Sequence, residues 1–142
     1  MKLVVIDGLG GGLGAQIISS IEKVLNDSVE IIALGSNSAA TTRMIKEGAS
    51  KGATGENAIK FSVNKADIII GPIGIIVPNS MSGEITPVMA EAVASVSAEK
   101  YLIGIKQPHF NLIGLRDDSI NEMIDDLVEK LKGNIDEKYL LS

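Results

Sequence analysis

Short apolar runs alternate with amphipathic stretches along this chain, and turn residues separate the two kinds of segment. The runs Lys2–Ile6, Val29–Leu34 and Asp67–Ile70 are short, mostly apolar and rich in β-branched residues. This pattern is typical of buried strands in a parallel sheet. Tyr101–Ile105 is a fourth such run, and after a brief turn we expect Phe110–Leu115 to return beside it as an antiparallel hairpin strand.

Helical periodicity fills the stretches between these runs. The clearest helices are predicted over Gly12–Leu25 and Asp118–Lys132, where apolar residues recur every three or four positions and form one stripe. Shorter helices are predicted over Ala39–Glu47, Glu56–Val63 and Thr86–Ala98. The last of these begins with a threonine cap followed by proline at the first helical position.

Polar and glycine-rich residues are expected at the ends of these elements. Asn26-Asp27-Ser28 ends the first helix, Ser38 and Thr54 are predicted N-caps, and Gly133 follows the final helix. The remaining glycine-rich segments are predicted as connections, Gly48–Gly55 without regular structure and Gly71–Gly83 as a loop with room for one helical turn.

The alternation of strands and helices predicts a three-layer α/β domain. We expect a Rossmann-like, doubly wound and mostly parallel sheet, with a C-terminal hairpin strand and a terminal helix, formed by residues 1–142 as one domain. Ligands of such sheets bind at the carboxyl ends of the strands. The segments Asp7–Gly14, Gly35–Ser38 and Gly71–Gly83 should therefore converge on the binding site.

The most informative segment is the glycine-rich sequence between the first strand and the first helix. Glycines allow positive φ and a close approach of the backbone to a ligand, and the amides and dipole of a helix N-terminus favour an anion. We therefore predict a phosphate or carboxylate site at the residues Gly8, Gly10, Gly11, Gly12, Leu13 and Gly14. The alternative is that these glycines serve only to pack the helix tightly on the sheet.

Further candidates surround this loop. At the ends of the second and third predicted strands, the candidate ligand-binding residues are Ser36, Asn37, Gly71 and Pro72. Other polar candidates are Asp7, Arg43, Asn79, Ser80 and Glu84. Asp7 could bind Mg²⁺ or a ligand hydroxyl, or it could accept hydrogen bonds from the loop amides. Glu84 belongs to a loop expected at the ligand edge of the sheet.

Composition narrows the functional classes. The chain has 142 residues, a net charge of −5 and no cysteine, and the two arginines Arg43 and Arg116 lie far apart. We see no basic stripe with aromatics, which argues against nucleic acid. One histidine, His109, without cysteines makes a zinc site improbable, and no metal is predicted. With no apolar run of roughly 18 residues and a strand that starts at Lys2, we expect a cytoplasmic protein without a membrane partner or signal peptide.

The spacing Gly8-x-x-x-Gly12-x-Gly14 resembles the opening of short-chain dehydrogenases/reductases, as does Val5-Ile6-Asp7-Gly8 through Ile17. The resemblance covers the first ~35 residues and implies a Rossmann unit that binds NAD(P). The catalytic Tyr-x-x-x-Lys of that family is missing, because Tyr101 is followed by Lys106, one position too late. An acid for a ribose 2′-hydroxyl is also missing after the second strand, where Ser36, Asn37 or Arg43 could hold a 2′-phosphate instead.

The whole chain resembles a family of short bacterial proteins of unknown function. The stretches that carry this resemblance are Ile6–Gly12, Ile31–Gly35, Gly52–Ile59 and Gly71–Ile76. The resemblance implies no particular activity.

Three functions remain open on the sequence. The first is a nucleotide-binding protein or enzyme, with NAD(P) or another nucleotide on Gly10–Gly14, and the second is a binder of a small phosphorylated metabolite. The third is a structural or regulatory protein that assembles through the Ala/Ser-rich helix Thr86–Ala98. In addition, we expect a homo-oligomer, with a dimer as the simplest case, that contacts itself through this helix or through Phe110–Leu115.

Overall fold

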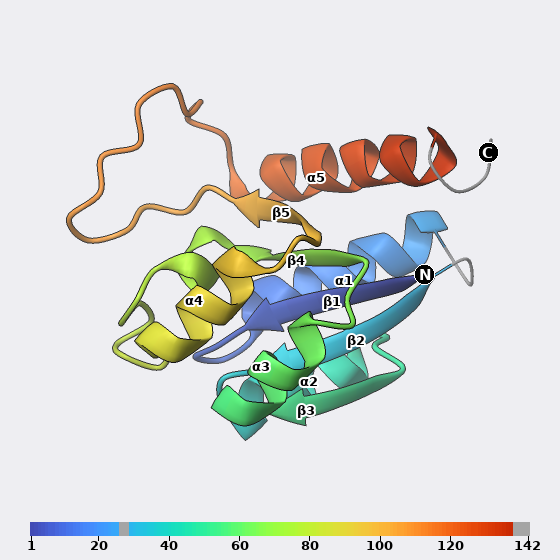
Figure 1. Ribbon diagram of the computed structural model, residues 1–142. Helices are drawn as coiled ribbons and strands as arrows, with labels where there is room; N and C mark the ends of the chain where they lie inside the picture. Colours follow the sequence, from blue (N-terminus) through green and yellow to red (C-terminus); the bar gives the residue numbers. More distant parts are fainter. Residues whose placement is uncertain (26–28, 138–142) are drawn as a thin grey trace.

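The computed structural model describes residues 1–25 and 29–137 as one three-layer α/β domain (Figure 1). A parallel sheet of five strands forms the middle layer, in the order β3-β2-β1-β4-β5. The strands are β1 Lys2–Asp7, β2 Glu30–Gly35, β3 Lys51–Thr54, β4 Ile68–Pro72 and β5 Glu99–Ile103. The predicted doubly wound fold is confirmed, because the strand order runs outward from β1 in both directions.

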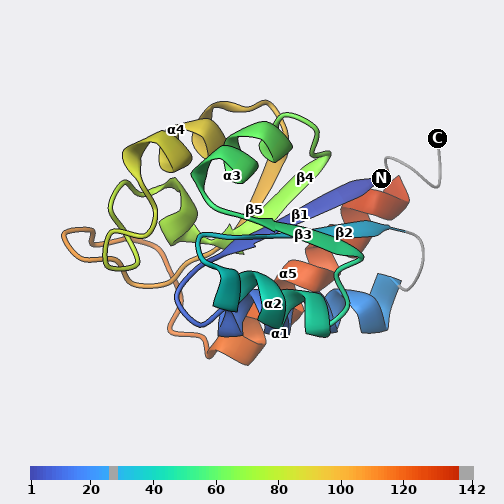
Figure 2. The ribbon, with the colours of Figure 1, turned by 90° about the horizontal axis from the view of Figure 1, so that it is seen from below.

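Helices cover both faces of the sheet, as Figure 2 shows along its edge. On one face lie α1 Gly12–Leu25, α2 Ser38–Lys46 and α5 Ile120–Ile135. On the other lie α3 Glu56–Val63, the 3₁₀ turn η2 Ile73–Ile76 and α4 Pro87–Ser95. No helix in the described ranges is both long and apolar enough to cross a membrane.

Strand β1 forms the centre of the core because both of its faces are covered. Leu3 and Val5 pack in the cluster below α1, α2 and α5, whereas Val4 and Ile6 pack in the cluster under α3 and α4. All four side chains are inaccessible to solvent. The continuous apolar run predicted from the sequence therefore follows from burial on two sides.

Several helix ends differ from the prediction by one or a few residues. Asn37, not Ser38, caps α2, since its Oδ1 accepts the amide of Ala40 at 2.9 Å. Helix α4 begins as predicted, with the Thr86 hydroxyl accepting the amide of Met89. Helix α5 continues through Gly133, which was expected beyond its end. The predicted end of the first helix at Asn26-Asp27-Ser28 lies outside the described residues.

Strand β3 was missed because the glycine-rich segment Gly48–Gly55 was predicted as a connection. Lys51–Thr54 extends the sheet at its edge by pairing with β2. Its side chains are largely exposed, so no apolar pattern indicated a strand. The hydroxyl groups of Thr54 and Thr41 form a hydrogen bond at 2.8 Å. Gly55, with φ of 99°, and not Thr54, is the N-cap residue of α3.

The predicted hairpin strand Phe110–Leu115 is wrong. The 104–119 segment forms neither strand nor helix, and it extends away from the sheet as the long orange loop in Figure 1. His109 and Gly114 have φ of 67° and 95°, which interrupts an extended chain. The apolar residues that suggested a buried strand here are not buried, since Ile113 is 95% exposed and Leu115 is 55% exposed.

Glycine in the middle of β4 is a packing requirement that can be tested. A β-carbon on Gly71 would lie 2.4 Å from the carbonyl oxygen of Ile6 on the neighbouring strand, whereas one on Gly133 in α5 would meet no atom within 4 Å. We expect Gly71→Ala to lower the free energy of unfolding by about 1–3 kcal/mol. The matched variant Gly133→Ala should raise it by about 0.5–1 kcal/mol. Urea unfolding of both variants measures the difference, and equal stabilities would contradict this account.

We further expect the loop at residues 110–115 to mediate self-association, because exposed apolar area of this kind usually contacts a partner. Sedimentation equilibrium should give a multiple of the 14.9 kDa chain mass. Ile113→Asp should weaken the association about tenfold or more, since burying one isoleucine contributes about 1.5–3 kcal/mol. Ile45→Asp on α2, where the isoleucine is 41% exposed, is the control. A wild-type protein that sediments at the mass of one chain would end the expectation.

Candidate functional site

The buried carboxylate of Asp7 organises the connection between β1 and α1. Its Oδ1 accepts the amide of Gly8 at 2.8 Å and its Oδ2 accepts the amide of Gly14 at 2.7 Å. Burial raises the pKa of Asp7 above its ordinary value of 3.8; the two amides oppose this rise, the nearby Glu84 adds to it, and Arg43 opposes it. In the structure, Asp7 therefore accepts hydrogen bonds from the loop amides, which is the second of the two roles that the sequence allowed for it.

The glycine loop itself leaves part of the N-terminus of α1 available. Gly11 donates to the carbonyl of Gly8 at 2.9 Å and adopts φ of 75°. A β-carbon there would lie 2.7 Å from Cα of Ala40, so glycine is needed where α2 passes the loop. Within the described chain, the amides of Gly10, Gly12 and Leu13 donate to no protein acceptor. These three amides can bind an anion.

Arg43 places a cation at the same helix end. Its Nη1 lies 3.2 Å from the position that a β-carbon on Gly12 would occupy, and 3.9 Å from the corresponding position on Gly10. The side chain is exposed, and no carboxylate of the residues described forms an ion pair with it. Free amides and an unpaired guanidinium thus meet beside the loop, which is a suitable environment for a phosphate.

A cleft of about 360 Å³ borders the glycine loop, between the carboxyl ends of β1 and β4. Most of the side chains that line it are apolar, namely Leu9, Leu13, Pro72, Met81, Ile105 and Pro108. Lys106 and Gln107 add polar groups at its margin. Such a mixture suits a ring system with a few polar substituents.

Residues 105–108 of this cleft were not among the predicted site residues. The sequence indicates the end of a strand and a hairpin turn for them, whereas in the structure β5 ends at Ile103 and they line the cleft. Their position directly after a predicted strand was the signal that could have identified them, because ligands bind at the carboxyl ends of parallel strands.

Glu84 joins the glycine loop to the residues that follow β2. Its Oε1 accepts the Ser36 hydroxyl at 2.6 Å, the Asn37 side-chain amide at 2.7 Å and the backbone amide of Leu9 at 2.9 Å. The Ser36 hydrogen bond, followed by those from Leu9 and Asn37, lowers the pKa of Glu84 below its ordinary value of 4.5 against the opposing effect of burial. Ser36 and Asn37 are thus brought to the glycine loop, but their donors are directed at a protein carboxylate.

The other predicted residues lie at different depths. Pro72 lines the cleft, whereas Gly71 is buried inside β4. Ser80 is also buried and donates its hydroxyl to the carbonyl of Gly74 at 2.5 Å, which indicates a structural role. Asn79 is exposed, with φ of 65°.

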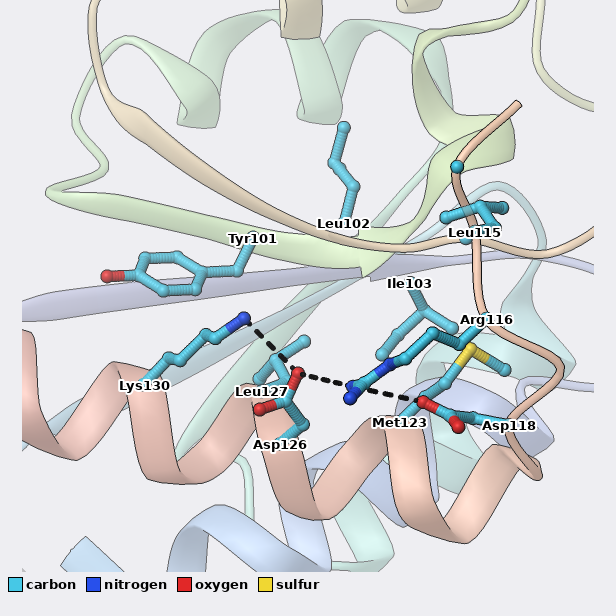
Figure 3. Close-up of a pocket in the computed structure, with 12 residues that line it drawn as sticks. Tyr101, Leu102, Ile103, Leu115, Arg116, Asp118, Met123, Asp126, Leu127 and Lys130 are labelled. Atoms are coloured by element: carbon cyan, nitrogen blue, oxygen red, sulfur yellow. Dashed lines mark ion pairs between the residues drawn. The ribbon is translucent and has the colours of Figure 1, made fainter. Parts of the chain in front are cut away.

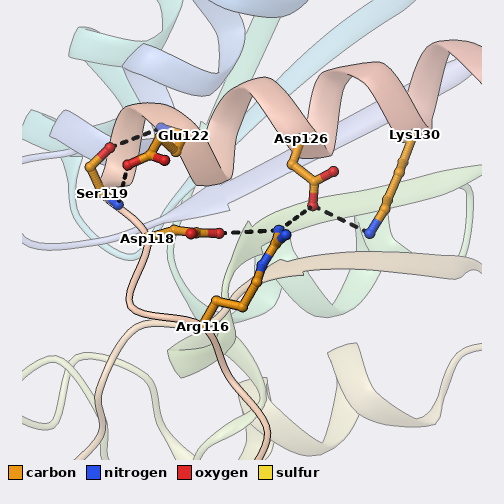
Figure 4. A network of polar contacts seen from close by, with 6 residues as sticks. All are labelled: Arg116, Asp118, Ser119, Glu122, Asp126 and Lys130. Atoms are coloured by element: carbon orange, nitrogen blue, oxygen red, sulfur yellow. Dashed lines mark hydrogen bonds and ion pairs between the residues drawn. The ribbon is translucent and has the colours of Figure 1, made fainter.

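A second cavity, of about 560 Å³, lies between β5, the 114–118 segment and α5 (Figure 3). Its charged groups form a chain of ion pairs at the surface (Figure 4). Arg116 lies 3.1 Å from Asp118 and 3.8 Å from Asp126, which Lys130 approaches to 3.3 Å. The two cations here already have carboxylate partners, and such exposed pairs contribute little. We therefore take the glycine loop, with the cleft that it borders and the unpaired Arg43 beside Gly12, as the candidate site.

The parallel sheet, its strand order and the glycine loop at the end of β1 define a Rossmann-like α/β domain. Residues 2–136 match the family described as a domain of unknown function (DUF3842), and the chain belongs to this family. This agrees with the resemblance to short proteins of unknown function.

Two solved structures are similar in fold. A dodecameric FMN-dependent UbiX-like decarboxylase from Escherichia coli O157:H7 aligns over 95% of this chain and 94% of its own, with 14% identity and a TM-score of 0.51. Apo saccharopine dehydrogenase (L-Glu forming) from Saccharomyces cerevisiae aligns over 75% of this chain with 12% identity and a TM-score of 0.49. This chain spans only 22% of that dehydrogenase. No curated protein matches.

The raised pKa of Asp7 predicts a pH effect on stability. In the pH range between its ordinary pKa and the raised one, the folded state keeps a proton that the unfolded state releases. The contribution of Asp7 to the free energy of unfolding is therefore present at low pH and lost as the pH rises through the pKa of the folded state. We expect the stability of the wild type relative to Asp7→Asn to fall with rising pH. Urea unfolding over roughly pH 3 to 8 measures it.

Asp67→Asn is the matched control for this measurement. Asp67 also accepts a backbone amide, that of Lys2 at 2.7 Å, but it is exposed. If the wild type instead gained stability relative to Asp7→Asn as the pH rises, the interpretation of Asp7 would be contradicted.

Proposed function

We propose that this protein binds a small molecule that carries a phosphate, with a nucleotide such as NAD(P) as the first candidate. The phosphate would accept hydrogen bonds from the amides of Gly10, Gly12 and Leu13 and pair with Arg43. The observation that carries the proposal is that these amides lack protein acceptors among the described residues and lie beside an unpaired guanidinium. A helix N-terminus and an arginine are both well suited to phosphate.

The charge of Asp7 is the main objection, because a carboxylate next to the helix end repels an anion. Two features reduce this repulsion. The carboxyl group of Asp7 is buried, and both of its oxygens accept loop amides, from Gly8 at 2.8 Å and from Gly14 at 2.7 Å. Arg43 adds the cation that an anion needs in this position.

The apolar cleft supports a ligand with a ring. Its lining by Leu9, Leu13 and Ile105 suits an aromatic base or flavin, and it adjoins the amides that would hold the phosphate. At about 360 Å³ the cleft is small for a ligand site. This size favours the second candidate, a small phosphorylated metabolite.

The ligands to test follow from this proposal. NAD, NADP, adenosine 5′-monophosphate and inorganic phosphate cover the nucleotide and phosphate requirements. FMN is included because the decarboxylase of similar fold is described as FMN-dependent, although that likeness supports the fold alone. A phosphosugar represents the second candidate.

We expect Arg43→Gln to weaken binding of each phosphate-bearing ligand about tenfold or more, because a charged hydrogen bond contributes about 1.5–3 kcal/mol. Lys46→Gln, which removes an exposed cation one turn further along α2, should leave affinity unchanged. Isothermal titration calorimetry measures both.

Gly12→Val tests the loop amides and Arg43 together. A β-carbon on Gly12 would lie 3.2 Å from Nη1 of Arg43, so the valine should abolish binding while circular dichroism shows an unchanged fold. Unchanged affinity in both Arg43→Gln and Gly12→Val would leave the glycines a packing role only.

A further inference from the structure

The end of strand β2 is where a sheet of this class presents groups to a ligand hydroxyl, and here that position has no acid of its own. The strand ends at Gly35 and is followed by Ser36 and Asn37, both half-buried. Their hydroxyl and amide groups are neutral donors and acceptors, whereas a charged acceptor makes a stronger hydrogen bond to a ligand hydroxyl. The sequence alone therefore indicates no charged hydroxyl acceptor at this edge.

The fold supplies one from a distant segment. Glu84 lies 48 residues from Ser36 in sequence, on the loop that precedes α4, and its Oε1 lies 2.6 Å from the Ser36 hydroxyl. The same oxygen accepts the side-chain amide of Asn37 and the backbone amide of Leu9, the second residue of the glycine loop. The Glu84 carboxylate is thus hydrogen-bonded both to the residues that follow β2 and to the glycine loop.

The loop that carries Glu84 is held in an uncommon conformation. Met81, Ser82 and Gly83 are consecutive residues with φ of 55°, 58° and 87°, an arrangement unfavourable for residues other than glycine. A hydrogen bond between Asn79 and Ile85 fixes the base of the loop, with the Asn79 amide 2.7 Å from the Ile85 carbonyl. Strained backbone of this kind is found mainly where a side chain must be held in place for function.

Only one oxygen of the Glu84 carboxylate is occupied. Oε1 has three donors, whereas Oε2 accepts no hydrogen bond from any residue in the described ranges. The side chain is half-buried rather than enclosed. An ionised carboxylate is an acceptor only, so the group that fits Oε2 is a hydroxyl or another donor.

We infer that Glu84 determines specificity at the candidate site: its Oε2 accepts a hydrogen bond from a ligand hydroxyl next to the phosphate loop, as on an unmodified ribose. Its charge also disfavours any ligand with a phosphate on that hydroxyl. The inference rests on the proposed function, because it concerns a ligand whose phosphate is bound at α1. It also reverses the expectation that Ser36 and Asn37 would hold a 2′-phosphate, since their donors are directed at Glu84.

The competing explanation is that Glu84 only ties the three segments together. Glu84→Gln separates the two roles. The carbonyl oxygen of glutamine can still accept from Ser36, Asn37 and Leu9, so the connection is kept, while the free carboxylate oxygen becomes a neutral amide nitrogen. Glu84→Ala removes both roles.

Glu56→Gln is the matched control. Glu56 also accepts a hydroxyl, that of Thr86 at 2.6 Å, and it lies at the first position of α3. Within the part of the chain that the structure describes, Glu56 makes no hydrogen bond to the glycine loop. Its substitution therefore removes a carboxylate of the same kind without changing the charge beside the loop amides.

The experiment compares ligands that differ at one hydroxyl. NAD and NADP differ only in the 2′-phosphate, and adenosine 5′-monophosphate differs from its 2′-deoxy form only in the 2′-hydroxyl. We expect the wild type to bind NAD about tenfold or more tightly than NADP, and to bind the 2′-deoxy nucleotide about tenfold less tightly than the ribonucleotide. Both ratios should shrink to within about threefold in Glu84→Gln and stay unchanged in Glu56→Gln.

Equal affinity of the wild type for the members of each pair, or ratios that persist in Glu84→Gln, would overturn the inference. Binding of inorganic phosphate that depends on Arg43, without any preference between these pairs, overturns the role of Glu84 and leaves the phosphate site intact. No binding of any ligand, inorganic phosphate included, overturns the phosphate site and the role of Glu84 together.

Discussion

The pair of hydrogen bonds from Gly8 and Gly14 to the Asp7 carboxylate is the constraint on which the site depends. It joins the end of β1 to the first turn of α1 and so fixes the shape of the intervening loop. Asp7 uses two of the loop amides, Glu84 accepts that of Leu9 and the Gly8 carbonyl accepts that of Gly11, so the amides of Gly10, Gly12 and Leu13 are the part of the helix end that is available. A buried carboxylate is costly, and these two charge-assisted bonds offset part of that cost.

The charges around the loop are arranged asymmetrically. Arg43 approaches the helix end from α2, whereas Glu84 approaches the first residues of the loop from the segment before α4. An anion is therefore favoured at the start of α1 and a hydrogen-bond donor near Leu9. The two positions are close together because α2 and the 79–86 loop converge on the carboxyl ends of β1 and β2, which is how parallel sheets of this kind assemble sites from distant segments.

The family to which this chain belongs has no described function, and the similarity to a UbiX-like decarboxylase concerns the fold. Fold likeness at this level of identity does not carry an activity. The chemical features of the candidate site are local: a loop rich in glycine, one unpaired arginine beside it among the described residues, and a glutamate brought from elsewhere in the chain.

The sequence by itself determined most of the elements and the position of the glycine loop between β1 and α1. The apolar runs and helical stripes act locally, and glycines between a strand and a helix have the same meaning in any such unit. It did not determine β3, which is held by backbone hydrogen bonds rather than by an apolar pattern, nor the irregular path of residues 110–115. The contacts of Arg43 and Glu84 were decided only by the tertiary structure. Pairing across 48 residues depends on how the strands are ordered, and no local pattern of side chains encodes that order.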